Sequence, residues 1–549
     1  MQVHSHAQIT LPAMLLGVGI CVGGFLFGYD LGVISGCLIM EPFIRVMGVY
    51  DPTAMLADSE GYLLSANRQS LITALLSAGT FFGALAQAPI SDFMGRRKSM
   101  LVWAITFSIG AIIQTTSGES ANTAANVGQI VAGRTIAGLG VGALSGLAPL
   151  YLAETAPKAI RGAMVSCYQL FIIAGICVSY CILYGTYTIK TSSACWRIPV
   201  ALQLLWGLVL IVIMLALPES PRWLLQKERA PEARKVMARM RGLPLEGGDA
   251  APAARQLMEE DVEEMLEGIR EEARTFEGYN YLTGYKLCFS TEQQMWRRTL
   301  TGCMLQLLQQ LCGQNFYYLY GPTLFTQANV PLEPLLIQLI FGVVSLICTV
   351  PALLMIEKVG RRKSLVWGAI LQAICAFTVA FVGHYGLPHG KNAKATTPSQ
   401  KSSANAFIAF AVLHLAFYSM FWGPTPWIFC SENFPQHLRA KAISLCSATN
   451  WIWNFLLSFF SNKISDKYGT FIMLIFGSVL VFAAIFSYLV VPELKGLSLE
   501  QVNEMYEDKK LKPWNSGKWQ PQTGRDTNRS AIGLSHILKL GTKKQSQVL

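Results

Sequence analysis

Charged side chains are scarce in this chain. Only 14% of its 549 residues are Asp, Glu, Lys or Arg, whereas 52% are hydrophobic. A soluble protein carries about 25% charged residues, because its surface must be solvated by water. The scarcity of charge excludes a soluble multidomain protein and predicts a chain that lies in a lipid bilayer.

The sequence also lacks the patterns that catalysis and metal binding require. It has no phosphate-binding loop and no nucleophile paired with a base. Its 13 cysteines show neither metal-ligand spacing nor an extracellular disulfide framework, and most lie in apolar segments. We therefore expect no enzyme, no metal and no cofactor apart from a coupling proton, and we interpret the cysteines as core-filling residues.

Long apolar runs, in contrast, follow one another along the chain. A helix needs about 20 predominantly apolar residues to cross a bilayer. Twelve spans are predicted, at residues 13–36, 69–90, 98–116, 124–150, 161–186, 196–217, 299–326, 332–356, 364–385, 405–431, 441–465 and 469–491. No clear cleavage site precedes the continuation of the first run, so we expect a retained span and not a signal peptide.

Three patterns of the first half return in the second half in the same order. Each returns after roughly 265 to 280 residues. The pairs are Gly95-Arg96-Arg97-Lys98 with Gly360-Arg361-Arg362-Lys363, Glu154-x-x-Pro157-x-x-x-Arg161 with Glu432-x-x-Pro435-x-x-x-Arg439, and Pro218-Glu219 with Pro492-Glu493. Parallel halves of six spans each are typical of transporters whose substrate site lies between the halves.

The net charge of +11 comes from basic residues in short loops on one side of the predicted spans. This positive-inside pattern argues against a nucleic-acid partner and predicts that both termini are cytoplasmic. We expect an all-α membrane protein of two six-helix bundles, 1–217 and 299–492. A cytoplasmic helical linker, 218–298, joins them, and a largely disordered tail, 493–549, follows. An acidic linker helix near 253–274 either latches onto the basic loops or presents a solvated face.

Asp30 lies inside the first predicted span, where an uncompensated acid costs about 2.5–3.5 kcal/mol. Arg134, in the glycine-rich fourth span, is the candidate partner. A carboxylate that alternates between pairing with arginine and holding a proton couples charge to conformation. The alternative is a permanent structural ion pair.

Amide side chains form a stripe on the seventh span. Gln306, Gln310, Gly313 and Tyr317 recur at helical spacing, and Gln309 lies beside them. Amides both donate and accept hydrogen bonds, which suits the hydroxyl groups of a neutral sugar or polyol. The alternative is hydrogen bonding between helices. We expect Gly321-Pro322 to end the regular helix, so that Asn315 reaches the same cavity.

Further candidates lie in other spans. Trp427 follows Gly423-Pro424 at a predicted break, where an indole can cover a sugar ring. Gln169, Asn450 and Asn454 add amides. Several amides with an aromatic lid and no cationic cluster indicate an uncharged polar solute.

These motifs together resemble the sugar porter family of the major facilitator superfamily, over nearly all of residues 15–500. They include Pro218-Glu219-Ser220-Pro221-Arg222, Gln309-Gln310-Leu311-x-Gly313-x-Asn315 and Pro492-Glu493-x-Lys495-Gly496. Gly79-Thr80-Phe81-Phe82-Gly83 is similar to the fungal hexose transporter branch. The resemblance implies a major facilitator fold with twelve transmembrane helices.

The resemblance also implies roles for individual residues. Sugar contacts are implied for Gln169, Gln309, Gln310, Asn315, Trp427 and Asn450, and proton coupling for Asp30, whose candidate partner is Arg134. Gating salt bridges that hold the outward-facing state are implied for Asp92, Arg96, Arg97, Glu154, Arg161, Glu219, Arg222, Glu357, Arg361, Arg362, Glu432, Arg439 and Glu493. Ser345 departs from the family pattern, because an asparagine usually contacts sugar there.

We expect a monomeric, multi-pass plasma-membrane protein that transports a hexose, with glucose as the default, by alternating access and proton symport. A facilitative uniporter is the first alternative, since fungal facilitators of the family also carry an aspartate at the position of Asp30. A sugar sensor that does not transport is the second, although the tail of about fifty residues is short for a family sensor.

Overall fold

The computed structural model describes residues 10–50, 61–155, 161–189, 192–240, 252–275, 281–327, 332–388, 397–435, 438–497, 499–508 and 511–519. Six long helices form the N-terminal bundle: α1 (Leu11–Cys37), α3 (Ala66–Met94), α4 (Arg96–Thr115), α5 (Thr123–Thr155), α6 (Arg161–Thr186) and α7 (Ala194–Ala216). The C-terminal bundle contains α12 (Met295–Leu311), α13 (Gln314–Gln327), α14 (Pro334–Val359), α15 (Arg361–Tyr385), α16 (Pro398–Phe417), η3 (Tyr418–Trp422), α17 (Thr425–Asn433), α18 (Arg439–Tyr468), η4 (Gly469–Phe471) and α19 (Ile472–Leu489).

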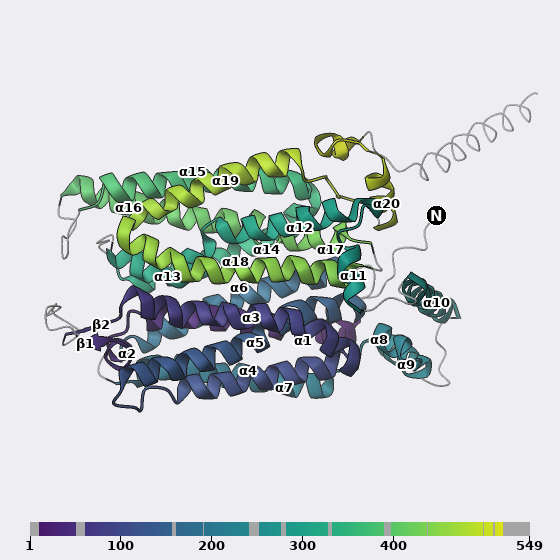
Figure 1. The fold of residues 1–549 in the computed structure, drawn as a ribbon, viewed down its shortest axis with the longest axis horizontal. Helices are drawn as coiled ribbons and strands as arrows, with labels where there is room; N and C mark the ends of the chain where they lie inside the picture. Colours follow the sequence, from purple (N-terminus) through teal and green to yellow (C-terminus); the bar gives the residue numbers. More distant parts are fainter. Residues whose placement is uncertain are drawn as a thin grey trace, which may run out of the picture.

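The two bundles lie side by side with their helices roughly parallel (Figure 1). One end carries α2 (Glu41–Met47) and the short antiparallel pair β1 (Val49–Tyr50) and β2 (Tyr62–Leu63). We call it the hairpin end. The opposite end carries α8 (Pro221–Gln226), α9 (Ala230–Met240), α10 (Pro252–Thr275) and α11 (Tyr281–Leu287), and we call it the linker end.

All twelve predicted spans correspond to helices, and the expected fold class of two six-helix bundles is confirmed. Among the residues that the structure describes, ten helical stretches are long and apolar enough to cross a membrane. The two counts differ for a structural reason. Lys441–Leu489 joins two predicted spans into one stretch, and the seventh predicted span is divided between α12 and α13, each of which is short.

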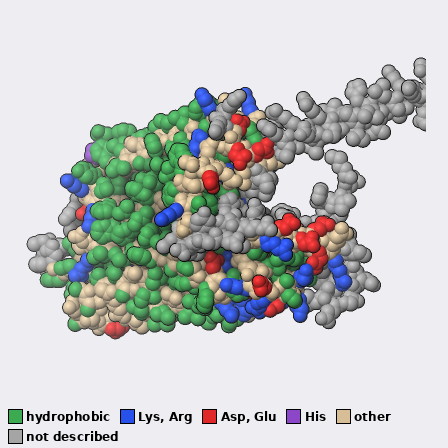
Figure 2. Space-filling model, turned by 45° about the vertical axis from the view of Figure 1, so that its right-hand side comes forward, with side chains coloured by type: hydrophobic (Ala, Val, Ile, Leu, Met, Phe, Trp, Pro, Cys, Tyr) green, Lys and Arg blue, Asp and Glu red, His purple; other side chains and the backbone are tan. Residues whose placement is uncertain are grey.

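Large apolar side chains remain exposed along the outer helices. On α4, Ile105, Ile109 and Ile112 are 44%, 48% and 50% exposed at helical spacing. Hydrophobic side chains cover much of the face shown in Figure 2, and charged side chains gather towards the linker end. An apolar face of this extent is stable against lipid but not against water.

The seventh span breaks at a different place from the one predicted. We expected Gly321-Pro322 to end the helix, but Pro322 lies inside α13. The break is at Cys312–Gly313, where Gly313 has a φ of +89° that favours glycine. A proline inside a membrane helix is tolerated because neighbouring groups satisfy the backbone carbonyl that it frees.

The tenth span breaks near the predicted site. Its helix α16 passes into the π-helical turn η3, and Gly423-Pro424 separates this turn from α17. A π-helical turn shifts the register of the backbone and often marks a functional site. Both broken spans belong to the C-terminal bundle. This bundle also carries the amide stripe of the seventh span.

The acidic helix predicted near 253–274 is present as α10, and the linker also contains α8, α9 and α11. Arg234 of α9 pairs with Glu259 of α10 at 3.0 Å, so at least one acidic side chain of α10 is neutralised within the linker. The latch between the acidic helix and the basic loops stays a prediction. The domain boundaries also stay predictions.

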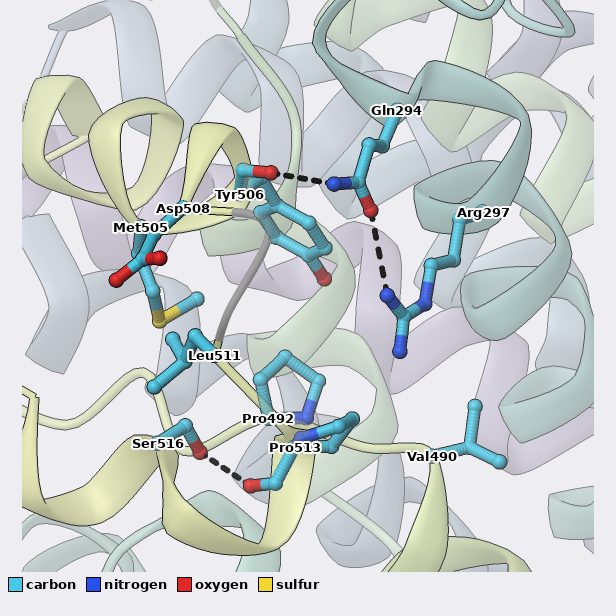
Figure 3. A pocket seen from close by; sticks show the side chains of 10 residues that line it. All are labelled: Gln294, Arg297, Val490, Pro492, Met505, Tyr506, Asp508, Leu511, Pro513 and Ser516. Carbon is cyan, nitrogen blue, oxygen red and sulfur yellow. Dashed lines mark hydrogen bonds between the residues drawn. The ribbon is translucent and has the colours of Figure 1, made fainter.

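The beginning of the tail is folded, in contrast to the expectation of a largely disordered segment from residue 493. It contains α20 (Leu499–Glu507) and η5 (Pro513–Lys518). Met505 is buried against the C-terminal bundle, and Gln294 donates a hydrogen bond to the backbone oxygen of Tyr506 at 2.6 Å (Figure 3). Apolar residues at helical spacing in α20 provide the buried face that composition alone concealed. Residues 520–549 lie outside the described part.

Candidate functional site

Four predicted sugar-contacting amides meet between α12, α13 and α18. The Nε2 atom of Gln310 donates to Oδ1 of Asn450 at 2.7 Å, and Asn315 donates to Oε1 of Gln310. Asn450 also donates to Oε1 of Gln309 at 2.9 Å. All four residues are buried. The break at Gly313 allows Asn315 of α13 to approach Gln310 of α12.

Two further residues complete this group, which we call the amide cluster and define as Gln306, Gln309, Gln310, Asn315, Asn450 and Asn454. Gln306 accepts from Asn450 at 2.7 Å, and Asn454 donates to Gln310 at 3.0 Å. Gln309 donates to the backbone oxygens of Trp422 and Gly423 at the break of the tenth span. The amide cluster therefore connects three helices with the irregular backbone of a fourth.

Amides that bind one another are able to bind a solute of the same chemistry. Each amide has two donor hydrogens and an acceptor oxygen, and a sugar hydroxyl donates and accepts in the same way. No ionisable side chain belongs to the amide cluster, so a neutral solute fits it better than an ion. The arrangement also supports the alternative of hydrogen bonding between helices, because the amides satisfy one another.

Two predicted sugar-contacting residues take no part in the amide cluster. Trp427 lies half-buried in α17, and Gln169 lies half-buried in α6 of the opposite bundle. Ser345, which departs from the family pattern, accepts a hydrogen bond from the hydroxyl of Tyr318 at 3.2 Å. The structure therefore places an α13 tyrosine in contact with the position where an asparagine usually stands.

Asp30 and Arg134 lie together as predicted. The Oδ1 atom of Asp30 is 3.7 Å from Nη1 of Arg134, and both side chains are completely buried. Neither carboxylate oxygen has a hydrogen-bond partner among the described residues, and neither do the guanidinium nitrogens. The pair is held by charge attraction without good hydrogen-bond geometry, which is a weak arrangement for two buried ions.

Sequence reasoning missed a neighbour of this pair. Gln203 of α7 is completely buried and close enough to influence the Asp30 carboxyl, although its amide makes no hydrogen bond to the described residues. The sequence does indicate this residue, because Gln203 is an isolated amide in a highly apolar span. A buried polar group inside a membrane helix requires a partner.

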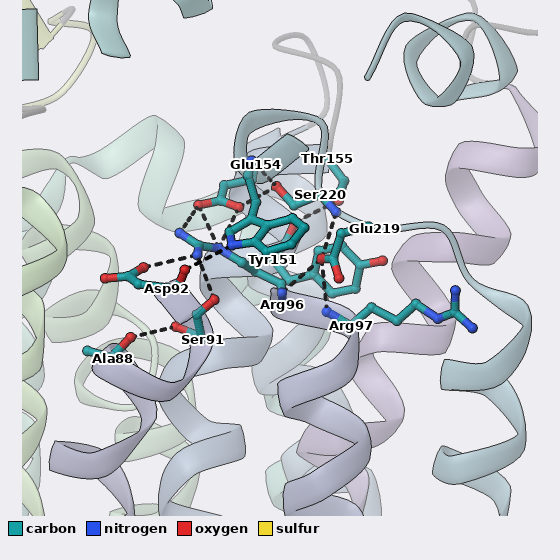
Figure 4. Close-up of polar contacts among 11 residues, drawn as sticks. Ala88, Ser91, Asp92, Arg96, Arg97, Tyr151, Glu154, Thr155, Glu219 and Ser220 are labelled. Carbon is teal, nitrogen blue, oxygen red and sulfur yellow. Dashed lines mark hydrogen bonds and ion pairs between the residues drawn. The ribbon is translucent and has the colours of Figure 1, made fainter. Parts of the chain in front are cut away.

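Five predicted gating residues of the first half form one cluster at the linker end (Figure 4): Asp92, Arg96, Arg97, Glu154 and Glu219. Arg96 binds Glu154 and Asp92, each at 3.0 Å. The carboxylate of Glu219 accepts from the backbone nitrogens of Arg96 and Arg97 at 2.8 and 3.0 Å. These two nitrogens begin α4, where a helix dipole favours negative charge.

The second half repeats this arrangement. Arg361 binds Glu432 at 2.7 Å, and Glu493 accepts from the backbone nitrogens of Arg361 and Arg362 at 2.8 and 3.2 Å. Gly95 and Gly360 make the two turns with φ values of +96° and +98°. The internal repeat read from the sequence therefore corresponds to two similar structural units, each assembled from one bundle.

The other predicted gating residues lie near the ends of their helices, and Arg97 makes further contacts with its side chain. Arg97 donates to the backbone oxygens of Met214 and Leu215 at the end of α7. Arg222 lies in α8, and Arg439 begins α18. The side chains of Arg161 and Glu357 lie outside the described part.

Hydrogen bonds across the two bundles extend from the middle of the molecule towards the hairpin end. Ser77 of α3 donates to Asn454 at 2.6 Å, and Asn462 of α18 donates to Gln69 at 2.9 Å. Tyr320 bonds to Thr73 and donates to the backbone oxygen of Ser458. Sequence reasoning missed these contacts, although Gln69, Thr73 and Ser77 recur at i, i+4 and i+8. The structure is joined between its bundles at the hairpin end.

Comparison with known proteins identifies the family. The model of the family described as sugar (and other) transporter matches residues 16–506. The chain belongs to the sugar transporter family. Among curated members of the sugar transporter family, it is 34% identical to the high-affinity hexose transporter HXT6 of Saccharomyces cerevisiae over 97% of this chain and 88% of that protein. It is also 34% identical to hexose transporter 2 of Kluyveromyces lactis, over 96% of this chain and 88% of that protein.

Solved structures agree with this assignment to the sugar transporter family. The chain is similar to the partially occluded inward-open xylose transporter XylE of E. coli, with a TM-score of 0.70 and 25% identity. That similarity covers 89% of this chain and 100% of XylE. A second structure, the proton:xylose symporter XylE bound to 6-bromo-6-deoxy-D-glucose, gives a TM-score of 0.71 and 26% identity over 90% of this chain and 99% of XylE. The predicted major facilitator fold is confirmed.

Proposed function

We propose that this protein is a monomeric plasma-membrane transporter that moves a hexose, with glucose as the substrate, by alternating access. The observation that carries the proposal is the amide cluster, a buried set of neutral donors and acceptors in the C-terminal bundle, where Asn454 accepts a hydrogen bond from Ser77 of the opposite bundle. The sugar displaces hydrogen bonds among the amides and replaces them with bonds to its hydroxyls. The curated relatives named above as hexose transporters support this choice of substrate.

The sugar contacts come from both bundles. Gln309, Gln310, Asn315 and Asn450 contact the sugar, and Trp427 and Gln169 complete the site when the bundles move. Trp427 lies five residues after Trp422, whose backbone oxygen accepts from Gln309, so a change in the tenth span is transmitted directly to the amides. Movement of the tenth span therefore brings the half-buried indole of Trp427 to the sugar.

Asp30 is the proton-coupling residue of this transporter. A proton on Asp30 removes its charge and releases Arg134, whereas deprotonation restores the ion pair. Both residues lie away from the amide cluster, so the proton and the sugar communicate through movement of the bundles. XylE, which is similar in structure, is described as a proton:xylose symporter.

Facilitated diffusion is the second candidate for the transport mode. It is favoured by the structure of the Asp30–Arg134 pair, because a fully buried pair also fits a permanent structural role. In that case Asp30 remains charged throughout the cycle, and sugar moves only down its own gradient.

The orientation is proposed from charge. Arg96, Arg97, Arg361 and Arg362 all lie at the linker end, which we therefore assign to the cytoplasm together with both termini. The hairpin end then faces outward. Because the bundles are joined at the hairpin end, the structure corresponds to a state closed towards the outside.

The test is uptake of labelled glucose into proteoliposomes, with and without an inward proton gradient. Accumulation above equilibrium that requires the gradient supports symport. Equal uptake without accumulation in both conditions contradicts coupling and supports the facilitator. Glucose binding without uptake contradicts transport and supports a sensor.

A further inference from the structure

A group of thiols lies next to the amide cluster, and the proposed function does not use it. Cys303 of α12, Cys430 of α17 and Cys446 of α18 come from three different helices. The Sγ atoms of Cys303 and Cys446 are 4.0 Å apart. Cys430 and Cys446 are buried, whereas Cys303 is half-buried.

A glycine allows these sulfur atoms to converge. A Cβ atom placed on Gly302 would lie 2.7 Å from Sγ of Cys446 and 3.4 Å from Sγ of Cys430. The first distance is too short for any side chain, so the absence of one at Gly302 creates the space for the thiols. The close approach of the thiols therefore depends on glycine at position 302 of α12.

The thiols are linked to the amides by helix geometry. Cys303 precedes Gln306 by three residues, and Cys446 precedes Asn450 by four, so each thiol lies one helical turn from an amide. Gln306 and Asn450 bond to each other at 2.7 Å, one turn further from the linker end. The Nε2 atom of Gln306 also lies 3.7 Å from Sγ of Cys430.

We propose that Cys303 and Cys446 form a peroxide-oxidisable dithiol that controls the amide cluster. Hydrogen peroxide transfers one oxygen atom to Sγ of Cys303, giving a sulfenic acid and one water. The Cys446 thiol then attacks that sulfur, the S–S bond forms, the S–O bond breaks, and a second water leaves. The two thiols lose two electrons and two protons in total, and the peroxide is reduced.

The division of roles follows from exposure. The half-buried Cys303 is the thiol that peroxide reaches, and the buried Cys446 resolves the sulfenic acid. A disulfide has an S–S distance of about 2.0 Å, so the sulfur atoms must approach by about 2 Å. This movement shifts α12 against α18 and disturbs the bond between Gln306 and Asn450. The effect on transport rests on the proposed function, whereas the disulfide itself does not.

The experiment uses the full chain in proteoliposomes, treated with hydrogen peroxide and then with a thiol-blocking maleimide. Mass spectrometry of the digested protein is expected to find a peptide linked through Cys303 and Cys446. Initial uptake of glucose at low concentration is expected to fall by about tenfold, the effect of losing one well-placed hydrogen bond. Reduction with dithiothreitol should restore it.

Two variants sharpen the test. Cys303→Ser should remove both the linked peptide and the sensitivity of uptake to peroxide. Cys375→Ser is the control, because Cys375 is a buried thiol on α15, away from Cys303, Cys430 and Cys446. Uptake by this variant should be as sensitive to peroxide as uptake by the unmodified protein. A digest without a Cys303–Cys446 link overturns the proposal. A link that leaves glucose uptake unchanged contradicts an effect of the disulfide on the amide cluster. If the reduced protein fails to transport, the proposed function fails, but the linked peptide still tests the dithiol.

Discussion

The carboxylate of Asp30 lies 3.7 Å from the guanidinium of Arg134, with both side chains at 0% exposure. Neither partner is fully satisfied by hydrogen bonds to the described residues. Two ions so deeply buried depend on each other, because removing one leaves the other charged in a medium that solvates it poorly. A substitution of either residue should therefore change both the stability of the protein and its proton coupling.

Replacing Asp30 by Asn should abolish accumulation of sugar driven by a proton gradient, because an amide cannot take up the proton. It should also destabilise the protein by roughly 3–5 kcal/mol, since Arg134 remains charged and buried. Uptake in proteoliposomes and thermal unfolding measure the two effects. Asp466→Asn is the matched control, because Asp466 is exposed at the end of α18. Gradient-driven accumulation by Asp30→Asn would exclude Asp30 as the proton site.

Replacing Gln310 by Ala should weaken sugar affinity by about 1–3 kcal/mol, because a sugar hydroxyl loses its partner. The half-saturating sugar concentration in uptake assays measures this loss. Gln372→Ala is the control, since Gln372 is equally buried but donates to its own helix, at the backbone oxygen of Gly368. An unchanged half-saturating concentration for Gln310→Ala would remove this residue from the site.

Replacing Tyr320 by Phe should open the hairpin end more often. The change removes the hydroxyl that contacts Thr73 of the opposite bundle and the backbone oxygen of Ser458. Only the bond to Thr73 crosses between the bundles, and it contributes about 0.5–1.5 kcal/mol, so the population of the opened state should rise by a few-fold. Spin-label distances between α3 and α18 measure the shift. A distance distribution equal to that of the unmodified protein would contradict a role of Tyr320 in closure.

Replacing Gly95 by Ala should destabilise the first half by about 1–3 kcal/mol, because φ near +96° is strained for any residue with a Cβ. The new Cβ would also lie 2.4 Å from the carboxylate of Glu219. Gly128→Ala is the control, since Gly128 lies in α5 with open space around it. Thermal unfolding compares the two variants, and equal stability would show that the turn tolerates a side chain.

The docked tail should detach at alkaline pH. Burial raises the pKa of Tyr506 to about 12, although Arg298 nearby opposes the shift. The neutral hydroxyl donates to Asn433 at 2.7 Å, and this bond is lost when Tyr506 ionises. Since the pKa is higher in the folded state, the stabilising contribution of Tyr506 is complete below about pH 10 and is lost as pH rises towards 12.

Limited proteolysis of the tail across this pH range measures the detachment of α20. The control is Tyr506→Phe, which should be cleaved more readily at neutral pH and should lose this step of the pH dependence. Cleavage of the unmodified tail that is independent of pH between 10 and 12 would contradict the prediction.

The sequence by itself determined the class of protein, the number of spans and the repeat of its two halves. Apolar runs such as residues 196–217 leave a membrane helix as the favourable structure, because a lipid-exposed backbone must satisfy its own hydrogen bonds. The sequence also paired Asp30 with Arg134, since each was an ion in an apolar span with one evident partner. Sequence motifs likewise indicated the family.

The tertiary structure decided how the polar residues combine. Helical spacing placed Gln306 and Gln310 on one stripe, but only the packing of α12 against α18 showed that they meet Asn450 and Asn454. The position of the break, at Gly313 and not at Pro322, was also decided there, because neighbouring helices determine whether a proline is tolerated. The convergence of Cys303 with Cys446 and the contact of Ser77 with Asn454 join residues far apart in the chain. Such contacts depend on the relative placement of helices, which local residue patterns do not encode.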